Sequence, residues 1–394
     1  MKNKFSKTII IVIPWFGEMA GGAEFLAKTL AMQFNSFGIK CLIFTTCSRS
    51  QHHNWWQDYY KEGRYIYDGL EVYRFSTNKN QIKYEASVIK TINNQQLTEE
   101  EKANFFICGI NSNNLIKSIK KFVYNDNYEI IALPYFQGLT HSIINSYKNR
   151  ISMIPCFHNE PQLYWNDSKT LIKNAKHIFF NSPEEKILVY NTYGNCFNNI
   201  ISNSPVAGLG IDIHKPIYKI LSNIPKKYFI YVGKKDEGKN IKILCDWFIE
   251  YKKHNKNNIK LLFVGGGNPN LIPKHNYFID YGFVDIITKN SLIKKSLGLI
   301  NLSQNESLSL VIMEAWLNSV PVVVANKCNV TKNLALKANG GLYADNKFEF
   351  EIILNYLSSN KNESLMLAKN GFDYIKKRYS IKRILNIYIN KLMQ

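Results

Sequence analysis

Short apolar runs rich in β-branched residues recur along the chain, and each leads through a loop into a helical pattern. The first run is TIIIVIPWF at 8–16, and AEFLAKTLAMQFNSFG follows at 23–38. Apolar residues in this second stretch recur at three- and four-residue spacing, which predicts an amphipathic helix. The next strand pattern is CLIFTTC at 41–47. Strand, helix and strand in this order predict a βαβ unit with a parallel sheet.

The same alternation continues and then restarts after a segment with prolines and lysines at 214–227, which indicates a linker. The later strands of the first series are expected at 129–136, 152–158 and 177–182. Those of the second series are expected at 228–233, 259–267, 297–303 and 321–326. Two such series predict two doubly wound α/β domains that face a central cleft, where ligands bind beyond the carboxyl ends of the strands.

The chain has 394 residues, which is enough for two hydrophobic cores. We expect a first domain at 1–215 and a second at 216–378. No apolar stretch is long enough to span a bilayer, and the run at 9–13 is too short for a signal peptide. Seven cysteines without a CxxC pair argue for reduced thiols and against a disulfide framework or a zinc site. These features predict a cytoplasmic protein.

The charge balance is strongly basic, with 50 Lys and Arg against 30 Asp and Glu and a formal net charge of +20. A surface this basic attracts polyanions. Nucleic acid, an anionic membrane surface and phosphorylated small molecules all remain open, as does a generally solvated basic surface. Because the lysines are spread along the chain and no nucleic-acid-binding motif is present, we expect no nucleic acid partner.

Two loops between a strand and a helix are candidates for anion binding. Gly21 and Gly22 lie where the first strand turns into a helix, so their backbone N–H groups could face a ligand. A tight structural turn is an equal alternative. In YVGKKDEGKN at 231–240, lysines gather at a helix start, where they oppose the helix dipole unless an anion lies between them. This loop predicts a diphosphate site, and the alternative is a solvated lysine run.

Two carboxylates lie beside an apolar segment in NESLSLVIMEAW at 305–316. Carboxylates in such surroundings are costly unless something pairs with them. The N–H groups of the loop and helix start could receive phosphate oxygens, with Glu306 projecting into the cleft. Glu314 could accept hydrogen bonds from a vicinal diol such as ribose hydroxyls. The alternative is that Glu306 caps the helix and Glu314 lies on the surface.

The spacing of Ser303, Glu306 and Glu314, followed by Ala315 and PVV at 321–323, resembles the retaining glycosyltransferases of family 4, which have the GT-B fold. Further segments resemble that family in the same order along the chain. They are GGAE at 21–24, YDGLEVYRF at 67–75, FHNEP at 157–161, FNSPEEK at 180–186, GLGID at 208–212, VGKKDEGKN at 232–240, FVGGG at 263–267 and YGFV at 281–284.

The resemblance implies that the second domain binds a nucleotide-sugar donor. Lys234 and Lys239 match the basic pair that neutralises the diphosphate, although a lysine at the first position lacks the bidentate fork of the usual arginine. Glu306 matches the residue that holds the sugar hydroxyls, and Glu314 the one that holds the ribose. The remaining donor-binding residues implied are Gly22, Phe283, Val284, Ser307, Leu308, Ser309 and Leu310. Of these, Phe283 and Val284 would flank the base, with ordinary core positions as the alternative.

His158 matches the histidine that contacts the donor sugar near the reacting carbon, so the resemblance implies a catalytic role for His158 and Glu306. A neutral His158 could help to stabilise positive charge near the anomeric carbon. Asn159 replaces the usual Asp, and Leu209 replaces the usual Asn. The final helix, 379–394, is implied to return to the first domain.

The implied activity is the transfer of a hexose or N-acetylhexosamine, with retention, to a glycan, lipid-linked or protein acceptor. UDP is the expected donor nucleotide, with GDP as the alternative. Neither a cofactor nor a metal is expected, because lysines neutralise the leaving group. The two glutamates bind hydroxyls and do not form an acid/base pair. The acceptor would lie on the first domain, where 49–69 is aromatic and basic, although Trp55 and Trp56 could equally be packing anchors.

The setting implied is the synthesis of a surface polysaccharide, lipopolysaccharide or other glycoconjugate, and the basic charge leaves open a peripheral contact with the anionic inner face of a membrane. Three alternatives remain. They are a nucleotide-sugar 2-epimerase on the GT-B fold, a basic nucleic-acid-binding protein and a membrane-surface scaffold with an inactive site.

Overall fold

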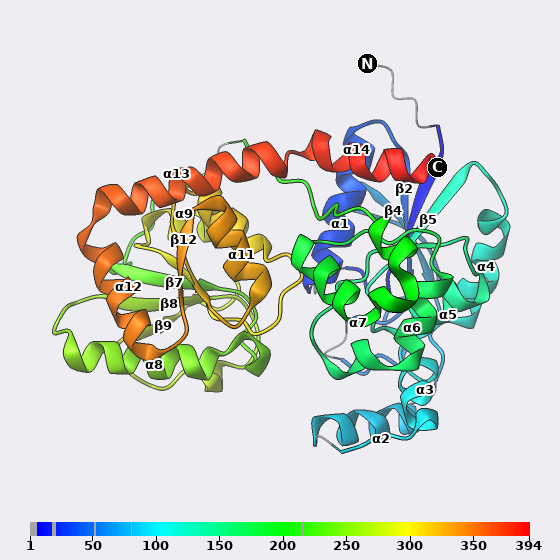
Figure 1. The fold of residues 1–394 in the computed structure, drawn as a ribbon, viewed down its shortest axis with the longest axis horizontal. Helices are drawn as coiled ribbons and strands as arrows, with labels where there is room; N and C mark the ends of the chain where they lie inside the picture. The colour runs from blue at the N-terminus through cyan, green and yellow to red at the C-terminus, as the bar shows by residue number, and fades with distance from the viewer. Residues whose placement is uncertain (1–5, 18–20, 51–52, 80, 94, 215) are drawn as a thin grey trace. The chain divides into compact units, whose positions relative to one another are not determined.

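The computed structural model describes residues 6–17, 21–50, 53–79, 81–93, 95–214 and 216–394 (Figure 1). The chain divides into two compact units. Unit 1 is Met1–Gly210 with Ile381–Gln394, and unit 2 is Ile211–Ser380. The division falls close to the domain bounds expected at 1–215 and 216–378, and the C-terminal segment belongs to unit 1.

Unit 1 contains a six-stranded sheet in the order β3-β4-β2-β1-β5-β6. Its strands are β1 (Thr8–Val12), β2 (Cys41–Thr46), β3 (Gly63–Tyr67), β4 (Leu70–Phe75), β5 (Tyr128–Ala132) and β6 (Ser152–Met153). All neighbouring strands are parallel except β3, which forms an antiparallel hairpin with β4. The central strand β1 is buried from Ile9 onward, which explains its near-continuous apolar sequence.

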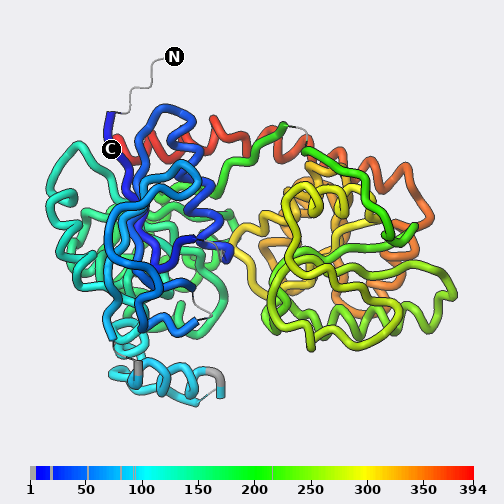
Figure 2. The backbone as a smooth tube through the Cα atoms, turned by 180° about the vertical axis from the view of Figure 1, so that it is seen from behind, coloured from blue at the N-terminus to red at the C-terminus, as the bar shows by residue number. Residues whose placement is uncertain are grey.

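The helices of unit 1 are α1 (Gly22–Ser36), α2 (Gln81–Ile92), α3 (Glu99–Ile107), α4 (Asn113–Val123), α5 (Gly138–Ser146), α6 (Asn166–Asn174), α7 (Pro183–Ser202) and α14 (Ile381–Leu392), with a 3-10 turn at Pro161–Tyr164. Helices α2 and α3 lie at one end of this unit, apart from its sheet, in both views (Figure 1; Figure 2). Helix α14 packs on α1, where Tyr388 meets Phe34 edge to face at 5.9 Å between ring centroids.

Unit 2 contains a six-stranded sheet that is parallel throughout, in the order β12-β11-β10-β7-β8-β9. Its strands are β7 (Tyr228–Val232), β8 (Lys260–Val264), β9 (Phe278–Asp280), β10 (Leu299–Asn301), β11 (Val322–Ala325) and β12 (Gly341–Ala344). The chain adds strands outward from β7 to β9, then crosses back to place β10 on the other side of β7. The strand order therefore reverses between β7 and β10, the switch point at which doubly wound sheets bind ligands.

Helices cover both faces of the unit 2 sheet (Figure 1). They are α8 (Ile241–His254), α9 (Ile286–Lys295), α10 (Leu310–Leu317), α11 (Asn329–Ala338), α12 (Lys347–Ser359) and α13 (Lys361–Arg378), with 3-10 turns at Glu237–Lys239 and Pro269–Leu271. Helix α8 packs with α12, and α10 packs with α9 and α13. Among the described residues, no helix is long and apolar enough to cross a membrane.

Several strand predictions in unit 1 are too long, and the strand expected at 129–136 ends at Ala132. The strand expected at 152–158 ends at Met153, because Pro155 has no N–H for a ladder and Cys156 has a positive φ of 57°. The strand expected at 177–182 forms only isolated bridges, at Ile178 and Phe180. The second segment contacts the two-residue strand β6 only through the bridge from Met153 to Ile178, so that no longer ladder forms there.

Candidate functional site

The loops that follow β7 and β10 lie side by side at the switch point of unit 2. The backbone N–H of Gln304 donates to the carbonyl of Gly238 at 3.2 Å, and the Asn240 side chain donates to the carbonyl of Leu302 at 2.7 Å. These bonds join segments that are about sixty residues apart in the sequence. The structure thus places the predicted lysine loop next to the predicted glutamate loop.

Lys239 and Glu306 form an ion pair within these loops. The Lys239 Nζ lies 2.8 Å from the Glu306 Oε1, and the side chains are 30% and 15% exposed. Asp236 caps the 3-10 turn that ends at Lys239 by accepting its backbone N–H at 3.0 Å. Glu306 does not cap α10, since Ser309 occupies the N-cap position. The alternative that Glu306 is a helix cap is therefore wrong.

The other lysines of the loop have different surroundings. Lys234 is exposed and lies 3.4 Å from the Asp236 carboxylate. Lys235 is only 3% exposed, and its ammonium donates to the Gly265 carbonyl and, at 3.0 Å, to Asp280 Oδ1. Lys235 therefore ties the loop after β7 to the ends of β8 and β9. Lys234 and Lys239, the two lysines predicted to bind the donor, remain partly accessible.

Glu314 lies on α10 and pairs with a lysine that the sequence reasoning missed. The Lys289 Nζ of α9 lies 2.7 Å from Glu314 Oε1, and both side chains are about one-fifth exposed. Lys289 belongs to a lysine-rich helix, and nothing in its local sequence distinguishes it from its neighbours. Each of the two predicted hydroxyl-binding carboxylates is thus paired with a lysine, which offsets the cost of its partial burial.

The start of α10 is the part of the loop expected to cradle phosphates. Ser309 has φ 61° and ψ 71°, and its side chain does not cap the first turn of the helix. Leu308 and Ser309 are buried, whereas Ser307 and Leu310 are half-buried. The hydroxyl of Ser303 is buried and has no hydrogen-bond partner within the part of the chain that the structure describes. The backbone N–H groups at this helix start suit an anion.

Phe283 and Val284 lie in the loop between β9 and α9. Phe283 is 87% exposed, so its alternative assignment as a core residue is wrong. Val284 is half-buried. Asp285 follows them and caps α9 by accepting the N–H of Thr288 at 2.8 Å. An exposed aromatic ring on this loop is free to stack on a planar ligand.

In unit 1, His158 lies in the loop after β6 beside two other polar side chains. Its Nδ1 is 3.9 Å from Glu160 Oε1, and the buried Tyr135 hydroxyl donates to the same oxygen at 2.7 Å. Burial, together with the neighbouring Glu160, raises the pKa of Tyr135 well above its ordinary value. Glu160 thus lies near His158, beyond hydrogen-bond distance, and is held by Tyr135.

The backbone that leads to His158 is anchored by a buried carboxyl group. Glu185 Oε1 accepts the N–H of Phe157 at 2.6 Å, and Oε2 accepts the N–H of Asn181 at 2.5 Å. Burial raises the pKa of Glu185 to about 8, against the opposing effect of these N–H donors. A glutamate in the first turn of a helix is usually exposed to solvent. Nothing in the sequence therefore predicted that Glu185 is buried and holds this backbone.

Gly22 is the first residue of α1, and a side-chain carbon added there would meet no atom of the described residues within 4 Å. The nearby Glu24 carboxyl is buried, which raises its pKa, while hydrogen bonds from the N–H groups of Glu24 and Gly21 act in the opposite direction. The chain's own carboxyl group therefore occupies the start of this helix. Residues 18–20 of the predicted glycine loop lie outside the described residues.

In the segment at 49–69 that is expected to bind an acceptor, the two tryptophans are packed inside unit 1, whereas most of the other described residues are exposed. The rings of Trp55 and Trp56 stack at 3.4 Å between centroids, and both residues are 8% exposed. Trp15 contacts Trp55 edge to face. These contacts favour the packing alternative for the two tryptophans. Residues 51–52 of this segment lie outside the described residues.

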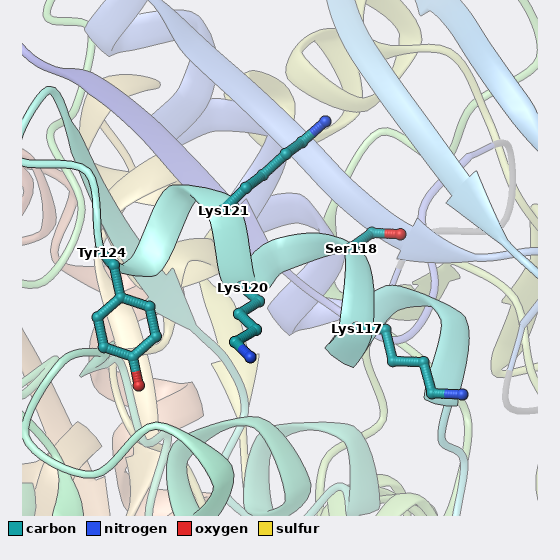
Figure 3. Close-up of a pocket in the computed structure, with 5 residues that line it drawn as sticks. All are labelled: Lys117, Ser118, Lys120, Lys121 and Tyr124. Atoms are coloured by element: carbon teal, nitrogen blue, oxygen red, sulfur yellow. The ribbon is translucent and has the colours of Figure 1, made fainter.

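A hollow of 520 Å³ lies on α4 and is lined by Lys117, Ser118, Lys120, Lys121 and Tyr124. Figure 3 shows the three lysine side chains pointing in different directions from the helix. Because their ammonium groups do not converge, this hollow is a poorer ligand site than the switch point of unit 2. Among the described residues, no group of three or more His, Cys, Asp or Glu side chains could hold a metal ion.

Known proteins resemble this chain in its fold and, within unit 2, in its sequence. The family described as "Glycosyl transferases group 1" matches residues 217–373, which lie within unit 2. Comparison with curated proteins gives no match. Three similar solved structures are an E. coli trehalose-6-phosphate structure bound with UDP-2-fluoro glucose, a mutant of S. aureus TarM with fondaparinux, alpha-GlcNAc-glycerol and UDP, and Anabaena HepE with UDP and glucose.

The E. coli structure is 11% identical with a TM-score of 0.74, and the match covers 98% of this chain and 99% of that chain. The TarM structure is 13% identical with a TM-score of 0.70, over 98% and 100%. The HepE structure is 14% identical with a TM-score of 0.68, over 98% and 100%. At these identities the likeness shows the fold, which is the GT-B fold with two parallel-sheet α/β domains. With the family match to unit 2, it supports a glycosyltransferase.

Proposed function

We propose that this protein is a retaining glycosyltransferase that transfers a hexose or N-acetylhexosamine from a nucleotide sugar, a UDP-sugar by preference. The observation that carries the proposal is the Lys239–Glu306 pair beside the start of α10, at the switch point of the unit that matches the glycosyltransferase family. In this arrangement a cation and a carboxylate lie beside helix N–H groups, which supports the proposal. A sugar diphosphate needs all three.

In the proposed mechanism, the donor diphosphate receives Lys234, Lys239 and the first N–H groups of α10. Lys239 then turns from Glu306 to a phosphate oxygen, and Glu306 accepts hydrogen bonds from the sugar hydroxyls. Glu314 similarly exchanges Lys289 for the ribose hydroxyls. The positive charges stabilise the phosphate as negative charge develops on it.

The transfer step exchanges one bond at the anomeric carbon for another on the same face of the sugar. The bond to the diphosphate oxygen breaks with its electron pair, the acceptor oxygen forms the new bond, and the departing phosphate takes the acceptor proton. His158 would hydrogen-bond the sugar and stabilise positive charge near the reacting carbon, with Gly22 contacting the donor. This route needs neither glutamate as a nucleophile.

The acceptor would be a glycan, lipid-linked or protein acceptor bound by unit 1, in the synthesis of a surface polysaccharide, lipopolysaccharide or other glycoconjugate. The net charge of +20 supports peripheral contact with an anionic membrane surface. The preference for UDP is supported by the structures of TarM and HepE, which hold UDP. We propose that the enzyme works in the cytoplasm and without a metal or cofactor.

The test is a thermal-shift and calorimetric panel of UDP-, GDP-, ADP- and CMP-sugars. Wild-type protein should be stabilised by a UDP-sugar, because a ligand that binds only the folded state raises the unfolding temperature. Glu314→Ala should lose that stabilisation, and Glu306→Ala should keep nucleotide binding but lose sugar transfer by about 100-fold. Glu363→Ala, in the first turn of α13, is the control. If no nucleotide sugar stabilises the wild type, the proposal is wrong.

A further inference from the structure

One buried asparagine contacts three parts of the loop that carries Glu306. Asn301 is the last residue of β10 and is 3% exposed. Its Oδ1 accepts the N–H of Ser303 at 2.9 Å, and its Nδ2 donates to Ser309 Oγ at 3.1 Å. The same Nδ2 lies 3.5 Å from Glu306 Oε1. A single carboxamide therefore joins the beginning, middle and end of the loop at 302–309.

Asparagine is an unfavourable residue for this position unless these contacts stabilise it. The neighbouring residues Leu299, Ile300 and Leu302 are buried and apolar. Asparagine is depleted in strands, and a buried amide costs free energy unless it is hydrogen-bonded. The side-chain bonds of Asn301 described above all go to one loop. The residue is therefore better explained by the shape of that loop than by the stability of the strand.

The loop requires a left-handed backbone conformation at Ser309. Its φ of 61° and ψ of 71° lie in the left-handed region, which a residue with a side chain adopts at a cost. Its hydroxyl does not cap α10 but receives the bond from Asn301. Since Ser309 immediately precedes α10, its backbone sets the direction of the first N–H groups of that helix. Asn301 thus contacts both the helix start and Glu306.

We propose that Asn301 is a positioning residue for donor binding, an inference that rests on the proposed function. Its carboxamide fixes the position of the Glu306 carboxylate relative to the start of α10. The sugar hydroxyls and the diphosphate can then be bound at the same time. Asn301 itself need not touch the donor.

The experiment compares Asn301→Ala with the double variant that also carries Ser309→Gly. Asn301→Ala should lower kcat for sugar transfer from a UDP-sugar by about 100-fold, because a displacement of about 1 Å can cost that much. The affinity for UDP should fall less. Ser309→Gly in the same background should recover about tenfold, because glycine adopts the left-handed conformation without help from a side chain. A purely structural asparagine would show no such recovery.

Asn257→Ala is the matched control. Asn257 also makes three side-chain bonds in unit 2, to Lys252, Ile259 and Tyr251, but it lies before β8 at the amino edge of the sheet. This variant should lower the unfolding temperature and keep kcat. If Asn301→Ala does not fold, Ser309→Ala removes the same bond from the other side and should lower kcat in folded protein.

Two outcomes would overturn the inference alone. One is a wild type that transfers sugar while Asn301→Ala, or Ser309→Ala where the first does not fold, transfers it equally well. The other is an Asn301→Ala variant whose lost activity is not recovered at all by Ser309→Gly. A wild type that binds no nucleotide sugar would instead overturn the proposed function, and the role of Asn301 with it. Circular dichroism and unfolding temperatures of all variants separate these results from loss of the fold.

Discussion

The two units have similar sheets, mostly parallel in unit 1 and wholly parallel in unit 2, but they hold their polar residues in different ways. In unit 2 the predicted lysines and glutamates come from the segments that follow β7 and β10, where the strand order reverses, while Phe283 and Val284 follow the edge strand β9. The carboxylates lie partly exposed beside lysines, as in Lys239–Glu306 and Lys289–Glu314. In unit 1 two carboxyl groups near the predicted residues, those of Glu24 and Glu185, are buried against backbone N–H groups, whereas Glu160 beside His158 is partly exposed. The first arrangement can exchange its partners for a ligand, whereas the second holds loops in place.

The same difference appears in the comparisons. The glycosyltransferase family matches 217–373, inside unit 2, while the solved structures resemble the whole chain only at the level of fold. A site built from paired charges at one sheet edge needs particular residue types at particular spacings. Loops that bind varied acceptors on a common scaffold are free to change. Unit 2 therefore carries the recognisable sequence signature.

Substituting Lys235 and Lys239, which lie in the same loop of unit 2, should separate a role in stability from a role in ligand binding. The expected loss of UDP affinity is the largest effect predicted for this comparison. Lys239→Met should weaken UDP binding about 10- to 100-fold, because a charge-assisted contact to phosphate is lost. Lys235→Met should keep UDP affinity but lower the free energy of unfolding by about 2 kcal/mol, because Asp280 loses its buried partner. Titration calorimetry and urea unfolding measure the two effects. Equal UDP affinity of Lys239→Met and wild type would contradict the proposed exchange.

The buried carboxyl group of Glu185 in unit 1 should make the stability of the protein depend on pH. Because the pKa of Glu185 is raised to about 8 from an ordinary 4.5, the folded state binds more protons than the unfolded state between these values. Stability should therefore fall as pH rises through this window, by on the order of 2 kcal/mol, and Glu185→Gln should remove this part of the dependence. Urea unfolding of both proteins at about pH 5 and about pH 8 measures it.

The neighbouring Glu184, which is only half-buried, supplies the control for this measurement. Glu184→Gln should reproduce the wild-type pH profile. A Glu185→Gln profile as steep as that of the wild type would show that the carboxyl does not hold its proton. The proposed difference between the buried carboxyl groups of unit 1 and the lysine-paired carboxylates of unit 2 would then be contradicted.

Phe283 gives the smallest expected effect and tests whether an exposed residue of unit 2 serves the ligand. Phe283→Ala should weaken UDP binding about tenfold through loss of stacking on the base. It should leave the unfolding temperature unchanged, because the ring is 87% exposed. Phe348→Ala, on the similarly exposed Phe348 at the start of α12, is the matched control and should change neither quantity. Unchanged UDP affinity of Phe283→Ala would remove this residue from the proposed site.

Much of the fold could be predicted because its signals are local. The apolar runs at 8–16 and 228–233 became the central strands β1 and β7, and the helical spacing at 23–38 became α1. The hairpin β3–β4 was missed, although Asp68 and Gly69 supply the Asp-Gly pair that favours a two-residue hairpin turn. The strand expected at 152–158 was too long because a buried apolar run does not reveal a positive φ.

The candidate site was only partly predictable from the sequence, because some of its contacts depend on packing between distant segments. The loop lysines and Glu306 have the residue types and spacing that phosphate and hydroxyl recognition require. Lys289, by contrast, becomes a partner of Glu314 only through the packing of α9 on α10. Asn301 carried a weak signal as a polar residue within LGLINLS, but its meaning depends on contacts with a loop that folds back on it.

The sequence by itself determined the alternation of strands and helices, the two series and the residue types at the loop ends. These follow from hydrophobic periodicity and turn chemistry, which act over a few residues. Only the tertiary structure decided that β10 lies beside β7, that Lys235 is buried while Lys239 meets Glu306, and that Asn301 reaches Ser309. Strand order and side-chain pairing depend on how distant segments share one core. A lysine in a loop therefore has no defined partner until the sheet has formed.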